Sequence, residues 1–194
     1  MIVIDDFIQD QVFLDIISTD ETFFGPNGNF MWWDGWWNNE PITKKQHLIK
    51  NIWASNSVPG ISNLVGFEYW TGIYGPDQAN KDLGPHYDKD ELHWARTGGQ
   101  EGGEIIRPVI GTVYYPKPMD IDGGYLEIFS KGEDNEPERI QPVYNRLVIF
   151  DAGNHKHRVT EVTRGIRYAI AINLWQTELL AAKEGSMTIE EHNW

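Results

Sequence analysis

The chain has 194 residues, of which 40% are hydrophobic and 23% are charged, a composition typical of globular domains rather than of disordered or fibrous proteins. Sixteen basic residues against 29 acidic ones give a net charge of −13. This charge argues against a nucleic-acid partner, because such partners are usually bound through a basic surface. Cysteine is absent, which excludes a disulfide scaffold, thiol catalysis and cysteine-ligated metal sites.

Neither a signal peptide nor a membrane span is expected. The N-terminus lacks a basic segment followed by a long apolar run. The longest apolar stretch, Tyr168–Trp175, is interrupted by Asn173 and is far too short to cross a bilayer. We therefore expect a soluble cytoplasmic protein with no membrane partner, folded as a single domain over residues 1–194.

The first 65 residues predict a helical and aromatic support for the rest of the domain. Gln9–Ser18 carries apolar side chains at helical spacing. Thr43 is a candidate N-cap for a second helix with one apolar face. A tryptophan cluster lies between the two helices, and it is more often core or interface packing than a binding platform. Its members are Trp32, Trp33, Trp36 and Trp37.

From Gly66 onward, short runs rich in Ile, Val, Tyr and Phe are separated by turn residues, which predicts strands. The expected strands are Phe67–Tyr74, Ile105–Tyr115, Tyr125–Phe129, Arg146–Phe150 and Arg167–Trp175. Many short strands at this spacing are typical of a sandwich, jelly roll or barrel. We expect a mainly β fold with N-terminal helices, a core over residues 66–175, and a tail over residues 176–194 that contains one closing helix.

His86 and Asp88 form the most informative pair of polar residues. In an extended segment, residues two apart project to the same side, so both side chains could bind one metal ion. A third ligand would come from His93, His155 or His157, the later histidines before the tail. Two histidines and one carboxylate form the facial triad of non-haem Fe(II) oxygenases. On its own, the His86–Asp88 pair is also compatible with two surface or helix-capping residues that bind no metal.

The segment from His157 to Trp175 resembles the closing segment of the 2-oxoglutarate- and Fe(II)-dependent oxygenases, which has His-x-Val, then Gly-x-Arg, then an apolar strand. Here these motifs are His157-Arg-Val159 and Gly165-Ile-Arg167. Further motifs follow the order of that family, and the order is closest to its prolyl hydroxylase branch. They are Ile4–Phe7, Thr112–Tyr115, Gly123–Phe129 and Asn145–Phe150.

The resemblance implies a double-stranded β-helix, a jelly-roll variant, with Fe(II) bound by His86, Asp88 and His157. It also implies that Arg167 pairs with the distal carboxylate of 2-oxoglutarate, since a guanidinium group grips a carboxylate with two hydrogen bonds. Tyr74 and Tyr115 match positions that line the cosubstrate pocket, although both also fit plain strand core. A shifted pairing of His155 with Arg164 is the alternative to His157 with Arg167, which we prefer because Val159 and Gly165 align with it.

The implied activity is that of a dioxygenase that converts 2-oxoglutarate and O2 to succinate and CO2 and hydroxylates an unactivated C–H bond, with ascorbate as a candidate reductant. The expected substrate is a prolyl residue of a peptide or protein, entering past the glycine-rich segment Glu91–Glu104, which we expect to be a flexible lid or a long surface turn. His93 in this segment is a candidate substrate contact or a polar loop residue.

The alternative functions for the protein are a small-molecule hydroxylase of the same family, a cupin-type metal- or sugar-binding module, and a zinc hydrolase. The last two leave Arg167 unexplained.

Overall fold

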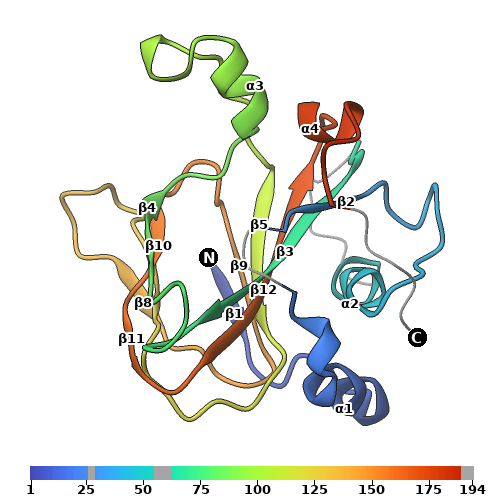
Figure 1. The fold of residues 1–194 in the computed structure, drawn as a ribbon, viewed down its shortest axis with the longest axis vertical. Coiled ribbons are helices and arrows are strands. Elements are labelled where there is room, and N and C mark those ends of the chain that lie inside the picture. The colour runs from blue at the N-terminus through green and yellow to red at the C-terminus, as the bar shows by residue number, and fades with distance from the viewer. Residues whose placement is uncertain (26–28, 55–62, 189–194) are drawn as a thin grey trace.

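The computed structural model describes residues 1–25, 29–54 and 63–188, and two antiparallel sheets dominate it, with helices covering the outer face of the larger one (Figure 1). The larger sheet has the strand order β1 (Ile2–Ile4), β9 (Arg146–Phe150), β5 (Ile110–Tyr115), β12 (Arg167–Trp175), β3 (Gly66–Tyr74) and β2 (Met31–Trp33). The smaller sheet has the order β4 (Leu83–His86), β10 (His157–Val159), β7 (Leu126–Ile128) and β8 (Glu138–Ile140). Strands β6 (Asp122–Gly123) and β11 (Val162–Arg164) form a third pair. This architecture confirms the predicted mainly β, jelly-roll fold.

Strands β3 and β12 pair along nine residues, from Arg167 opposite Tyr74 to Trp175 opposite Gly66. Side chains alternate between the two faces of a sheet. On the outer face, large apolar side chains of both strands are buried against the helices. On the inner face, the small residues Gly72, Ala169 and Ala171 line a cavity between the sheets. Larger side chains of the same face, Trp70, Tyr74 and Arg167, enclose it. A Cβ atom at Gly72 would lie 2.7 Å from the Tyr74 ring, so this glycine makes room for the ring.

The two predicted helices are present and pack against the larger sheet. Helix α1 (Gln11–Thr19) begins at Asp10, whose carboxylate accepts hydrogen bonds from the amides of Val12 and Phe13. Helix α2 (Lys44–Trp53) begins at Thr43, whose hydroxyl accepts a bond of 3.2 Å from the Gln46 amide, which confirms the predicted cap. The apolar face of α2 is fully buried. In residues 1–25, 29–54 and 63–188, no helix is long and apolar enough to cross a membrane.

Several elements differ from the prediction. The segment Glu91–Glu104 is largely helical, with α3 (Glu91–Arg96) capped by the Asp90 carboxylate and a 3-10 helix over Gly99–Glu101. Helix α3 projects beyond the sheets at one end of the molecule (Figure 1). Strand β5 begins at Ile110 rather than five residues earlier, beyond Pro108, which has no amide proton to donate to a sheet.

The ends of the chain also refine the prediction. The N-terminal segment is more than a helical support, since β1 and β2 form the two edges of the larger sheet. The closing helix of the tail is the single turn α4 (Leu180–Lys183), and residues 189–194 lie outside the described residues. The tryptophan cluster divides: Trp33 is core, whereas Trp37 is 42% exposed. The boundaries at residues 65 and 175 stay a prediction.

Candidate metal centre

His86 and His157 lie opposite each other on neighbouring strands. His86 ends β4 and His157 begins β10, and the antiparallel register makes them direct partners. Directly opposed residues project from the same face of a sheet, and the two ring centroids lie 4.2 Å apart. Asp88 follows β4, and its amide donates a hydrogen bond of 3.0 Å to the Ala152 carbonyl, which fixes the chain at this point.

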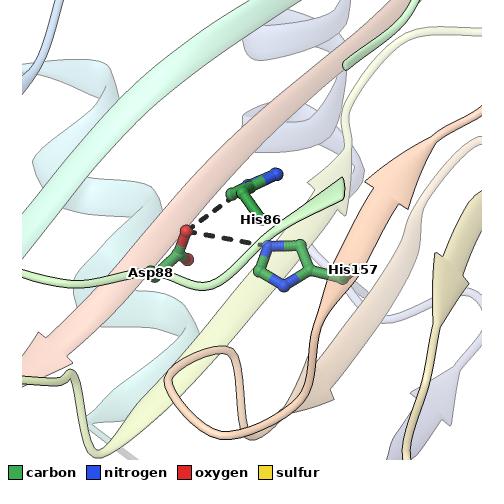
Figure 2. Close-up of side chains that lie close together, drawn as sticks. All are labelled: His86, Asp88 and His157. Carbon is green, nitrogen blue, oxygen red and sulfur yellow. Dashed lines mark ion pairs between the residues drawn. The ribbon is translucent and has the colours of Figure 1, made fainter. Parts of the chain in front are cut away.

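Both imidazole rings face the same carboxylate oxygen (Figure 2). The Oδ1 atom of Asp88 lies 3.5 Å from Nε2 of His86 and 3.6 Å from Nε2 of His157. The opposite ring nitrogens donate to backbone carbonyls, Nδ1 of His86 to Gly84 at 2.7 Å and Nδ1 of His157 to His155 at 3.0 Å. The hydrogen bond at one ring nitrogen decides where the proton sits, so the Nε2 lone pairs are free to bind a metal.

The electrostatic surroundings favour the neutral form of His157. Burial lowers the pKa of His157, the neighbouring His86 adds to this effect, and the Asp88 carboxylate opposes it only in part. A metal binds the neutral imidazole and the ionised carboxylate. One ligand atom from each of the three residues lies within 4.8 Å of the other two. The donor set therefore fits a divalent metal such as Fe(II), and no second group of this kind occurs in the described part of the chain.

Asn173 on β12 holds the aspartate in place. Its Nδ2 atom donates a hydrogen bond of 3.0 Å to Oδ2 of Asp88, the oxygen that faces away from the histidines. The same Nδ2 atom lies 3.3 Å from Oε2 of Glu68, its register partner on β3. Burial and the nearby Asp88 carboxylate raise the pKa of Glu68 to about 8. Sequence reasoning missed both residues, although a polar side chain in the middle of an apolar strand is a usable signal.

Arg167 lies in the same cavity as the three metal-type ligands. This cavity of about 50 Å³ is lined by His86, Asp88 and His157 at one side and by Arg167 at the other. Arg167 is 2% exposed, and its guanidinium group donates to the Gly124 carbonyl at 3.0 Å. Among the described residues, no aspartate or glutamate forms an ion pair with it. A buried cation without a counter-ion is costly, so an anionic ligand at this place would be stabilising.

Two tyrosines flank this guanidinium group, and of the two only Tyr74 lines the cavity. Tyr74 is the register partner of Arg167 on β3, and its ring centroid lies 5.5 Å from the guanidinium carbon. The Tyr115 hydroxyl accepts a hydrogen bond of 3.3 Å from Nη2 of Arg167. Burial raises the pKa of Tyr74, and the charge of Arg167 offsets this only in part, so the phenol stays neutral and can donate a hydrogen bond.

The alternative residues are placed elsewhere. Arg164 lies on the outer surface and is paired with Asp120 at 2.9 Å and Asp122 at 2.7 Å. His155 contributes its carbonyl rather than its ring to the site, so the shifted pairing of His155 with Arg164 is not assembled. His93 lies on α3 and lines none of the cavities around the metal centre.

The comparisons with known proteins agree with this geometry. Residues 70–175 match the family model of the 2OG-Fe(II) oxygenase superfamily, which confirms the resemblance seen in the sequence. A prolyl-4-hydroxylase from Pseudomonas putida is similar in structure, with a TM-score of 0.59 and 17% identity over 91% of this chain and 92% of that one. A viral collagen prolyl hydroxylase from Paramecium Bursaria Chlorella virus-1 is similar with a TM-score of 0.54 and 17% identity, over 91% and 90% of the two chains. At these identities the structural matches show a shared fold. No curated protein sequence matches the chain.

Proposed function

The chain belongs to the 2OG-Fe(II) oxygenase superfamily, and from that premise we propose that it is a 2-oxoglutarate-dependent dioxygenase with His86, Asp88 and His157 as its iron ligands. The observation that carries the proposal is the single cavity that joins these three side chains to Arg167, a buried cation without a carboxylate partner among the described residues. The bound Fe(II) would supply the oxygen chemistry that turns 2-oxoglutarate and O2 into succinate and CO2 and inserts oxygen into a C–H bond.

The protein's own residues bind and orient the cosubstrate in this proposal. Arg167 pairs with the distal carboxylate of 2-oxoglutarate through two parallel hydrogen bonds. Tyr115 holds the guanidinium group in position through its hydroxyl. Tyr74 closes the cavity from the β3 side and offers a phenol donor. The small residues of the inner sheet face leave room for the chain between the two carboxylates. Ascorbate would serve as the reductant that keeps the iron ferrous.

For the substrate we propose a prolyl residue in a peptide or protein. Two similar solved structures are prolyl hydroxylases, and the order of the sequence motifs resembles that branch. A second, larger cavity of about 320 Å³ opens beside His86 and Asp88 and offers room for a peptide. A small molecule hydroxylated by the same site is the alternative. A cupin-type binding module or a zinc hydrolase would leave the buried Arg167 without an anionic ligand.

The experiment is mass spectrometry of proline-containing peptides incubated with the protein, Fe(II), ascorbate and 2-oxoglutarate. We expect a product heavier by one oxygen atom, located on proline by fragmentation, and none with His157→Ala. His93→Ala is the matched control, because His93 lies outside the cavities. Oxygen added to a free amino acid or nucleotide, with none on any peptide, would reject the peptidyl-proline substrate and leave the oxygenase activity standing.

A further inference from the structure

A continuous groove leads away from the metal centre. The cavity of about 320 Å³ beside His86 and Asp88 is followed by one of about 250 Å³ that reaches α3 and α4. Phe30, Glu68 and Glu91 line both cavities, so the two share a wall and form one groove, here called the substrate groove. The Glu68 carboxylate therefore lies where any molecule that extends from the metal centre along this groove must pass.

The charges that face the groove are unbalanced. The carboxyl groups of Glu68, Asp88 and Glu91 line its first cavity together with a single cation, Lys89. The pKa of Glu68 is raised to about 8, and a cation bound beside this carboxyl group would favour its ionised form. The Lys89 ammonium lies 2.6 Å from Oε1 of Glu91, an exposed carboxylate at the rim, so this cation is already paired. In the part of the chain that the structure describes, no lysine or arginine pairs with Glu68, whose hydrogen-bond partner is the Asn173 amide at 3.3 Å.

The other carboxylate of the groove is already satisfied. Asp90 lines the second cavity, but its Oδ1 atom accepts from the His93 amide at 3.0 Å and its Oδ2 atom accepts from the Leu180 amide at 2.8 Å. Asp90 thus caps α3 and ties α4 to it. Among the described residues, Glu68 is left as the carboxyl group of the groove that has no cation partner.

Aromatic rings lie beside this carboxylate. Trp70 is two residues from Glu68 on β3, so both side chains project from the same face of the strand, and both line the first cavity. The ring of Phe30 lies 5.0 Å from the Trp70 ring, centroid to centroid, and lines both cavities. Aromatic faces next to a carboxylate attract an ammonium or guanidinium group, through the ring quadrupole and through a charge-assisted hydrogen bond.

We propose that the substrate carries a cationic group, an ammonium or guanidinium, that binds Glu68 beside the rings of Phe30 and Trp70. The proposal rests on the proposed function in so far as it treats the groove as the substrate's path. Asn173 donates to both Asp88 and Glu68, so Glu68 lies two hydrogen bonds from a metal ligand and the bound cation would lie three. The cationic group is therefore expected on a lysyl or arginyl side chain close to the hydroxylated carbon, either in a peptide or in a free basic amino acid.

The test is a binding measurement that does not require turnover. Isothermal titration of the purified protein with acetyl-Pro-Lys-amide, acetyl-Pro-norleucine-amide and free lysine compares matched probes with and without the cation. We expect the lysine dipeptide to bind at least about tenfold more tightly than the norleucine dipeptide, as a buried charge-assisted hydrogen bond provides. Glu68→Gln should abolish this preference, whereas Glu40→Gln, an exposed carboxylate paired with Lys50 outside the groove, should retain it. Phe30→Leu should reduce it about threefold.

Each outcome decides the proposal. Preference for the lysine dipeptide supports a basic residue in a peptide, and tighter binding of free lysine supports a basic amino acid. Equal binding of the two dipeptides to the wild type, no binding of any cationic probe, or a preference retained in Glu68→Gln would overturn it. A lysine preference in a protein that forms no succinate from 2-oxoglutarate would instead count against the proposed function and leave the cation site standing.

Discussion

Replacing Arg167 by alanine removes the only charged group that faces the cavity of the metal centre from the β12 side. In the proposed complex its guanidinium group forms a buried ion pair with the distal carboxylate of 2-oxoglutarate, and breaking such a pair costs about 3–5 kcal/mol. At about 1.4 kcal/mol for each factor of ten, the KM for 2-oxoglutarate should rise roughly 100- to 4,000-fold. Metal affinity should change little, since the guanidinium group contacts Gly124 and Tyr115 and none of the three ligands.

The assay is succinate formation over a wide range of 2-oxoglutarate concentrations, alongside Mn(II) titration of the same variant. Arg164→Ala is the matched control, because that arginine is paired with Asp120 and Asp122 on the outer surface. An unchanged dependence on 2-oxoglutarate in Arg167→Ala would refute the reasoning. A steep rise in Arg164→Ala would instead restore the shifted pairing with His155.

Three further predictions follow from the metal centre. His157→Ala should abolish the binding of one Mn(II) per chain in equilibrium dialysis, while His93→Ala should leave it intact; retained affinity in His157→Ala would remove His157 from the ligand set. Asn173→Ala should weaken Mn(II) binding about 10- to 100-fold, because it frees the Asp88 carboxylate to rotate; an unchanged affinity would show that Asp88 needs no such support. Burial holds the pKa of His157 below its ordinary value of about 6.5, so the folded metal-free protein resists protonation there, and its free energy of unfolding should fall as the pH drops below that value. Urea unfolding should show a shallower fall in His157→Gln, and equal slopes for the two proteins would contradict this.

Much of the site was predictable because its residues lie in short motifs. The spacing of the His-x-Asp pair predicts that His86 and Asp88 project to the same side, and the order of the His-x-Val and Gly-x-Arg motifs in the resembling family selects His157 and Arg167. The resemblance supplied their roles. The strands β3, β9 and β12 were predicted within one residue because their apolar runs are long and end at turn residues.

The missed parts depend on tertiary contacts. Asn173 and Glu68 form a pair only because β12 and β3 are neighbours in the sheet, and nothing local to either residue indicates that partner. The helix α3 escaped prediction because its six residues are followed by a glycine-rich segment that resembles a loop. Its order comes from the Asp90 carboxylate, which caps α3 and also binds the Leu180 amide of the distant tail.

The most direct test of the central claim is the stoichiometry of 2-oxoglutarate turnover by the wild type and by Asp88→Ala. The proposed function predicts equal amounts of succinate and CO2, formed only when Fe(II) and O2 are both present and only by the wild type. Asp88→Ala should retain its fold, as judged by circular dichroism, and form neither product. Turnover that persists in Asp88→Ala, or a wild type that binds one Fe(II) and 2-oxoglutarate per chain yet forms no succinate in air, would contradict it.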